Sequence, residues 1–219
     1  MTKIRVLSDG GKIRIRLSDE VKAPVVSATT GAEPLKLPEK EPQDDRVLLL
    51  SCRLVNLMEM RVESGFRPNE EDVEIVYALS GNVSNVPDKL HKLSSNTVVE
   101  KATDDYVVSS IKGMVEHIIR ERGTPLKLVV AVHTHPQGVP KPSDKDKRYF
   151  SNASDAIKAL IPGVNVLFGI HAISSESVRE RLEPTRTSKN TIKWCSITRE
   201  HELSFFTPDA NSWEVKLVD

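Results

Sequence analysis

The sequence predicts an α/β domain in which helices flank a mixed central β-sheet. A helical pattern over residues 104–122 is followed by an apolar run over 126–135 that is typical of a buried strand. A second helical pattern over 143–160 is followed by another apolar run over 164–173. Helices that alternate with buried strands pack as layers around one sheet, so this alternation defines the fold class.

The pattern over residues 104–122 indicates an amphipathic helix that ends at Gly123. Its apolar residues recur at helical spacing and are Val107, Val108, Ile111, Met114, Val115, Ile118 and Ile119. The helix over 143–160 is expected to be interrupted near 151–154, and residues 46–63 are expected to form a helix that begins with a short strand. Further strands are predicted over 74–81, 96–99, 192–197 and 213–218.

The first part of the chain predicts a separate unit. Residues 3–17 alternate charged and apolar side chains around Asp-Gly-Gly, which is a β-hairpin signal. Residues 22–45 are rich in Pro, Ala, Thr, Lys and Glu without a period and indicate a linker. We therefore expect an N-terminal hairpin and linker over 1–45 and the main domain over 46–219. Residues 175–190 are expected to form a polar insertion in the main domain.

Composition excludes several function classes. The 31 Lys and Arg balance the 31 Asp and Glu, so no net charge favours nucleic acid or an anionic membrane as a partner. No apolar stretch is long enough to span a membrane, and the N-terminus lacks a signal-peptide core, which predicts a cytoplasmic protein. Cys52 and Cys195 are expected to be reduced and buried, although a single bridge between them is the alternative.

His133 and His135 end the apolar run and can serve one metal ion. Residues i and i+2 of a strand point to the same face, with Cα atoms about 6.6 Å apart. Both imidazoles can therefore reach one metal, while Thr134 points the other way, so threonine rather than serine at this position is expected to have little effect. Pro136 ends the strand, and a loop leads to Ser143 and then Asp146 in the first turn of the next helix. A catalytic zinc needs three protein ligands and one open position.

Each half of this pattern also has a structural explanation. A pair of histidines at a strand end is common, and Ser143-x-x-Asp146 is a plausible helix cap with an acidic first turn. The fixed spacing of the two halves is what points to a shared site. That spacing is His-x-His, seven residues, Ser, two residues, Asp.

The spacing resembles the JAMM or MPN+ motif of zinc-dependent isopeptidases. That family also has an upstream glutamate before a short β-rich run ending in glycine. Glu74, before Ile-Val-Tyr-Ala-Leu-Ser-Gly81, best fits this position, with Glu70 and Glu71 nearby. The resemblance covers about residues 45–219 and implies an MPN fold with cytidine-deaminase-like layering. The N-terminal residues match nothing in the family's catalytic core.

The resemblance implies a role for each of five residues. His133, His135 and Asp146 would bind Zn²⁺, which activates a water for hydrolysis. Glu74 would take the proton of that water and pass it to the leaving amine. Ser143 would hydrogen-bond the oxyanion as the carbonyl becomes tetrahedral. No other cofactor is expected.

The implied substrate is ubiquitin or a ubiquitin-like protein joined through its C-terminal glycine to a lysine amine. Such tails bind by β-augmentation, with residues 94–106 and 175–190 as candidate insertions around them. A proteasome-type assembly is a further candidate partner. Two alternatives stay open: a non-catalytic or partner-dependent MPN scaffold, and a JAMM hydrolase that processes sulfur-carrier proteins of ubiquitin fold.

The remaining signals predict no further site. His201-Glu202 begins like the metalloprotease motif HExxH, but Phe205 stands where the second histidine is required. His91, His117 and His171 are isolated in the sequence, and His117 is expected at a surface or an interface. A basic cluster, Lys141, Lys145, Lys147 and Arg148, accompanies the predicted site and is expected to be solvated or to attract an acidic partner surface.

Overall fold

The computed structural model describes the backbone of residues 4–9, 12–17, 46–64, 75–93, 104–123, 125–136, 138–174 and 180–219. Side chains are described from residue 46 onward within these ranges, except over 104–110. The chain divides into two compact units, Met1–Glu41 and Pro42–Asp219. The domain boundary near residue 45 stays a prediction.

The first unit contains a hairpin of two strands, β1 (Ile4–Asp9) and β2 (Lys12–Leu17). The strands pair antiparallel from Ile4 opposite Leu17 to Asp9 opposite Lys12. This register leaves only Gly10 and Gly11 between the strands, as the Asp-Gly-Gly turn signal predicted.

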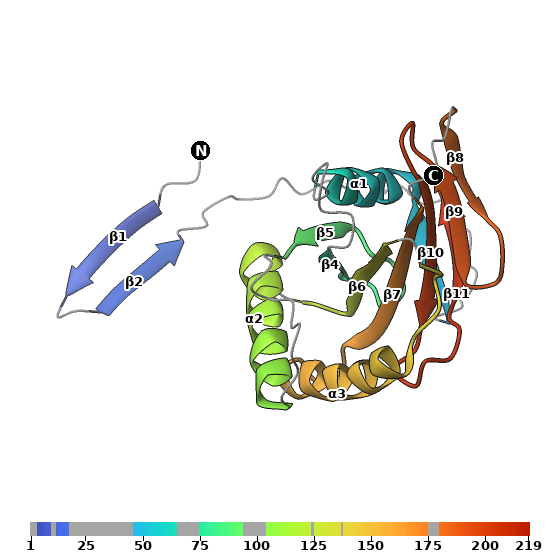
Figure 1. Ribbon diagram of the computed structural model, residues 1–219. Coiled ribbons are helices and arrows are strands. Elements are labelled where there is room, and N and C mark those ends of the chain that lie inside the picture. The colour runs from blue at the N-terminus through green and yellow to red at the C-terminus, as the bar shows by residue number, and fades with distance from the viewer. Residues whose placement is uncertain are drawn as a thin grey trace, which may run out of the picture. The chain divides into compact units, whose positions relative to one another are not determined.

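The second unit is built on a seven-stranded mixed sheet (Figure 1). Its order across the sheet is β5 (Lys89–Lys92), β4 (Val76–Gly81), β6 (Leu128–Pro136), β7 (Asn165–Ser174), β10 (Glu200–Phe206), β9 (Thr191–Cys195) and β8 (Leu182–Arg186). The pairing of β6 with β7 is parallel, and the other pairs are antiparallel. The predicted mixed sheet is therefore confirmed.

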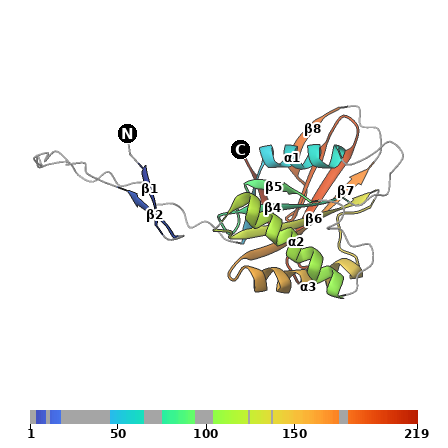
Figure 2. The same cartoon turned by 90° about the vertical axis from the view of Figure 1, so that its left-hand side faces the viewer.

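In the part of the chain that the structure describes, three helices cover the two faces of the sheet (Figures 1 and 2). Helix α1 (Cys52–Glu63) packs its buried residues, including Val55 and Met58, on one face. Helices α2 (Asp104–Arg122) and α3 (Asp144–Leu160) pack on the other face, with residues such as Ile118 and Ile157. The sheet is thus buried on both sides, which confirms the predicted layers.

A second, two-stranded sheet closes the unit beside α1. Strand β3 (Val47–Ser51) runs parallel to β11 (Glu214–Val218), and Ser51 then caps α1 by accepting a hydrogen bond from the Leu54 amide. The predicted helix over 46–63 therefore resolves into the expected short strand and a helix. No helix in the described part of the chain has the length and apolar character to cross a membrane.

Three strands were not predicted, and one predicted strand cannot be compared. Strand β8 lies inside the run expected as a polar insertion, and only its central Pro184 is buried. Strand β5 is only four residues long, and β10 contains the charged start of the sequence Glu-His-Glu-Leu-Ser-Phe-Phe. Polar residues hide all three strands from a hydrophobicity pattern. The strand predicted over 96–99 lies outside the described residues.

Helix α3 is continuous over its 17 residues, so the interruption predicted near 151–154 is wrong. Ala153, Ser154 and Ile157 lie on its buried face with Phe150, which stacks on Phe168 at a centroid distance of 4.3 Å. The small polar residues that indicated a break instead allow the helix to pack closely on the sheet.

Candidate functional site

The predicted ligands come from one strand end and one helix start. His133 and His135 lie near the carboxyl end of β6, and Asp146 lies in the first turn of α3. Helix α3 connects β6 to its parallel neighbour β7, so the chain must reverse direction directly after β6. This reversal brings the helix start back to the carboxyl end of β6, where ligand sites of α/β sheets commonly lie.

The structure brings the two imidazoles and the carboxylate together. The Nε2 atoms of His133 and His135 are 3.0 Å apart. The Nε2 atom of His133 lies 3.2 Å from Oδ1 of Asp146, and that of His135 lies 3.5 Å from Oδ2. All three side chains are largely buried yet keep between 13% and 19% of their surface exposed, so solvent can reach the group.

Asp146 also caps the helix that carries it. The Ser143 hydroxyl accepts from the Asp146 amide at 3.2 Å, and the Asp146 carboxylate accepts from the Ser143 amide at 2.7 Å. The Ser143 hydroxyl hydrogen is directed to Asp146 Oδ2, 2.6 Å away. Burial alone would raise the pKa of Asp146, but contacts with His133, His135 and Ser143 hold it far below its ordinary value.

The loop between β6 and α3 orients His135. Its Nδ1 atom lies 3.1 Å from the Val139 carbonyl oxygen, which can only accept a hydrogen bond. That contact requires a proton on Nδ1 and leaves Nε2 as the lone-pair nitrogen facing Asp146. A Cβ atom at Gly138 would come within 2.9 Å of the His135 Cβ, so the glycine permits the close turn.

These three groups fit a metal ion. Ligands around a tetrahedral zinc lie about 3.3 Å apart, given bonds of about 2.0 Å. The three separations of 3.0, 3.2 and 3.5 Å lie close to this value. Two neutral imidazoles and one carboxylate form a donor set that zinc and similar transition metals prefer. The group formed by His133, His135 and Asp146 can therefore hold a metal ion.

Glu74, the predicted general base, lies outside the described residues. Its sequence neighbour Ile75 is held by Thr134, whose hydroxyl accepts from the Ile75 amide at 2.8 Å. The Thr134 amide donates to the Ile75 carbonyl at 3.0 Å, and the next residue, Val76, pairs with His133. Thr134 faces away from the metal group, as expected, but it joins the start of β4 to the His-x-His strand. A serine would also present a hydroxyl here, so the expectation that threonine in place of serine has little effect stays a prediction.

A second group of possible ligands was not found from the sequence. His91, His117 and Glu121 bring their donor atoms within 4.8 Å of one another, so this group could also hold a metal ion. His117 and Glu121 are four residues apart on α2, which is a sequence signal for a shared helix face. His91 comes from β5, a strand that was not predicted, so its proximity could not be foreseen.

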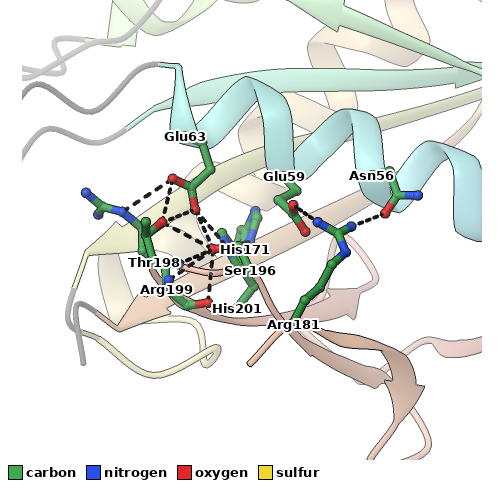
Figure 3. A network of polar contacts seen from close by, with 9 residues as sticks. All are labelled: Asn56, Glu59, Glu63, His171, Arg181, Ser196, Thr198, Arg199 and His201. Carbon is green, nitrogen blue, oxygen red and sulfur yellow. Dashed lines mark hydrogen bonds and ion pairs between the residues drawn. The ribbon is translucent and has the colours of Figure 1, made fainter. Parts of the chain in front are cut away.

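A third group of histidines is completely buried beneath α1 (Figure 3). His201 Nε2 lies 3.4 Å from Glu63 Oε1, and His201 Nδ1 lies 3.0 Å from His171 Nε2. His171 Nδ1 is 2.9 Å from the Tyr77 hydroxyl. His201 Nε2 makes no hydrogen bond of good geometry with Glu63, so the contact between them is one of proximity and charge. Tyr77, His171 and His201 form a hydrogen-bonded chain whose donors are set by the tautomers of the two imidazoles.

The same network ties α1 to the turn between β9 and β10. Glu63 accepts hydrogen bonds from the hydroxyls of Ser196, at 2.7 Å, and Thr198, at 3.0 Å. One turn earlier on α1, Glu59 accepts from Arg181 at 2.8 Å (Figure 3). Trp194 stacks on His201 with rings 5° from parallel. These contacts indicate a structural role for His171 and His201. They do not support a metalloprotease motif that begins at His201.

The two cysteines are free thiols, which leaves the alternative of a bridge between them unsupported. Cys195 is buried, as expected, and burial raises its pKa, with Glu200 adding to the effect. Cys52 is only half-buried, because it begins α1 at the edge of the layer. Neither thiol belongs to the metal group.

Two of three comparisons found known proteins that resemble this mixed-sheet domain with its candidate metal centre. Residues 62–182, more than half of the chain, match the family model "Prokaryotic homologs of the JAB domain". The chain therefore belongs to this JAB/MPN family. A solved JAB1/MPN domain protein from Archaeoglobus fulgidus is 14% identical, with a TM-score of 0.38 over 78% of this chain and 98% of that chain. No curated protein matched significantly.

Replacing Thr134 by Val should destabilise the protein by about 1–3 kcal/mol, because the buried Ile75 amide loses its acceptor. The measurement is urea unfolding of wild type, Thr134→Val and Thr134→Ser. The serine variant keeps the hydroxyl and should recover much of the loss. Equal stability of the valine variant and wild type would show that Thr134 does not hold Ile75.

Acid should destabilise the protein through its buried histidines. Burial lowers the pKa of His171, with His201 adding to the effect, and burial also lowers the pKa of His201. The unfolded chain therefore binds protons first, so stability is complete above about pH 6.5 and is lost as pH falls toward the folded-state pKa values. The expected slope reaches about 1.4 kcal/mol per pH unit for each histidine.

The test is urea unfolding of metal-free protein between pH 7.5 and 5.5, a window above the ordinary range of carboxylates. Using metal-free protein removes the separate effect of metal loss in acid. Wild type should become steadily less stable, and His201→Gln should show a shallower slope. A stability that stays constant or rises over this window would contradict the assignment of neutral, buried histidines.

Proposed function

We propose that this protein is a zinc-dependent isopeptidase. Its reaction would hydrolyse the bond between the C-terminal glycine of ubiquitin, or of a ubiquitin-like modifier, and a lysine amine. The observation that carries the proposal is the convergence of His133, His135 and Asp146 at one open site, with Ser143 directly beside them. Membership of the JAB/MPN family supports the same reaction class.

Different residues of the chain would bind the metal ion and transfer the proton. His133, His135 and Asp146 would hold zinc, which when bound would supply Lewis acidity for the scissile carbonyl and the attacking water. Glu74 would accept the proton of the water and return it to the leaving amine. This is a hydrolysis without a covalent intermediate, consistent with the absence of a thiol from the described site.

Ser143 would stabilise the negative charge that develops on the carbonyl oxygen. Its hydroxyl hydrogen is now directed to Asp146, so the proposed contact requires the hydroxyl to turn toward the substrate. Ser143 is exposed, and its side chain has room for this rotation. The helix cap would be retained, because the Ser143 oxygen can still accept from the Asp146 amide.

The surroundings of the site bear on the substrate. The basic cluster of Lys141, Lys145, Lys147 and Arg148 is exposed, and Lys147 is paired with Asp144 at 2.8 Å. The other three cations would favour an acidic surface on the modified protein over a basic one. The choice of a ubiquitin-like modifier comes from the family resemblance.

The test is cleavage of ubiquitin and of other ubiquitin-like proteins, each joined through its C-terminal Gly-Gly to a lysine peptide. Zinc-loaded wild type should cleave at least one of them, and chelation should abolish the activity. Glu74→Gln should lower kcat by about 10²–10⁴-fold, since a general base contributes about that much. Glu71→Gln is the matched control and should retain activity.

Other results would redirect the proposal. Zinc binding without cleavage of any ubiquitin-like substrate would favour a partner-dependent scaffold. Cleavage restricted to sulfur-carrier proteins of ubiquitin fold would favour a processing enzyme. Equal losses in Glu74→Gln and Glu71→Gln would contradict the role of Glu74.

A further inference from the structure

A separate group of three donors lies where α2 meets the edge strand of the sheet. His91 of β5 is fully buried, and its Nδ1 atom is 2.8 Å from Glu121 Oε2. His117 Nε2 is 3.3 Å from the other carboxylate oxygen, Oε1. This nitrogen is buried and makes no hydrogen bond of good geometry. Two imidazole nitrogens thus face one carboxylate, as at the first metal group.

The group is distinct from the one formed by His133, His135 and Asp146. Strand β4 lies between β5 and β6 and provides the register. Val76 of β4 pairs with His133 on one side, and Ala78 pairs with His91 on the other. Two residues along the strand and two strand spacings put the Cα atoms of the two histidines about 12 Å apart, and the His91 ring points further along β4 to Ser80, so one ion does not serve both groups.

The distances allow a metal ion after small side-chain shifts. The His117–Glu121 separation equals the value of about 3.3 Å expected between tetrahedral ligands, and the His91–Glu121 separation is shorter. Glu121 is exposed on its outer side, so water can complete the coordination. A site with three protein ligands and a solvent position should exchange its ion readily.

The surroundings of His91 suit a metal ligand, because the ring nitrogen that would not bind the ion already has a hydrogen-bond partner. Its Nε2 atom is 2.8 Å from the Ser80 hydroxyl, which can accept its hydrogen and leave Nδ1 with a lone pair. Arg122 fixes Ser80 in turn, donating to its hydroxyl at 3.2 Å and forming an ion pair with Asp88. This rigid support is what a ligand histidine requires.

Two cations oppose metal binding at this group. Lys89 Nζ lies 3.7 Å from Glu121 Oε2, and Arg120 lies 3.2 Å from His117 Nδ1. The Arg120 contact needs a lone pair on Nδ1, whereas metal binding through Nε2 places a proton there. Arg120 is exposed and would have to turn away, so its removal should strengthen binding.

We propose that His91, His117 and Glu121 form a second divalent-cation site, which clamps α2 to the edge strand β5. The ion would be zinc or another transition metal, since imidazole and carboxylate form the donor set. Its role would be structural, because one ion would join the edge strand β5 to the last turns of α2. The proposal does not depend on the isopeptidase activity.

The experiment measures zinc binding to the full-length, metal-free protein by equilibrium dialysis. Wild type should bind two ions. The double variant His133→Ala, Asp146→Asn, which lacks the first group, should bind one. Adding Glu121→Gln or His117→Gln to that background should abolish the remaining ion, while Glu116→Gln, which lies on the same helix and pairs with Lys112, should not. Arg120→Gln should bind more tightly.

Cobalt absorption and unfolding are measured in addition to the zinc stoichiometry. Cobalt bound to the double variant should show the visible absorption of a low-coordinate nitrogen and oxygen site, and Glu121→Gln should remove it. Unfolding of the metal-free variants checks that each is folded. The proposal is overturned if the double variant binds no ion, or if its ion survives both Glu121→Gln and His117→Gln.

Discussion

The carboxylate of Asp146 is the group on which the site depends, because it is shared by a helix cap and two histidines. Its Oδ2 atom accepts from the Ser143 amide and hydroxyl, and the same carboxylate faces both imidazoles. The start of α3 and the geometry of the candidate metal group therefore depend on the same side chain. A shift of the helix start would move a ligand, and a change of the ligand would weaken the cap.

The topology explains why these groups meet. Strands β6 and β7 are parallel, so the chain needs a helical crossover between them, and that crossover is α3. The loop from Pro136 to Ser143 is short, which keeps the first turn of α3 next to the end of β6. Thr134, on the opposite side of the strand, holds Ile75, whose neighbour in sequence is Glu74. His133 and His135 on one side of β6 and Thr134 on the other thus connect the candidate metal group to the start of β4.

The sequence predicted those parts whose signals are local. The His-x-His spacing, the Ser-x-x-Asp cap and the apolar stripe of α2 depend on neighbours within a few residues, and the structure contains all three elements. Strands β5, β8 and β10 were not predicted, because polar residues occupy them. The group of His91, His117 and Glu121 was not predicted for another reason. Its members are brought together by the pairing of β5 with β4 and the packing of α2, which no local sequence pattern encodes. His171 and His201 likewise meet only through the pairing of β7 with β10.

The central claim is that His133, His135 and Asp146 bind zinc together. The most direct measurement is a crystal structure of the zinc-loaded protein with anomalous diffraction data collected at the zinc edge. The account predicts a strong anomalous peak about 2.0–2.2 Å from Nε2 of His133, Nε2 of His135 and one Asp146 oxygen. Zinc-saturated crystals with no peak among these three residues would contradict it.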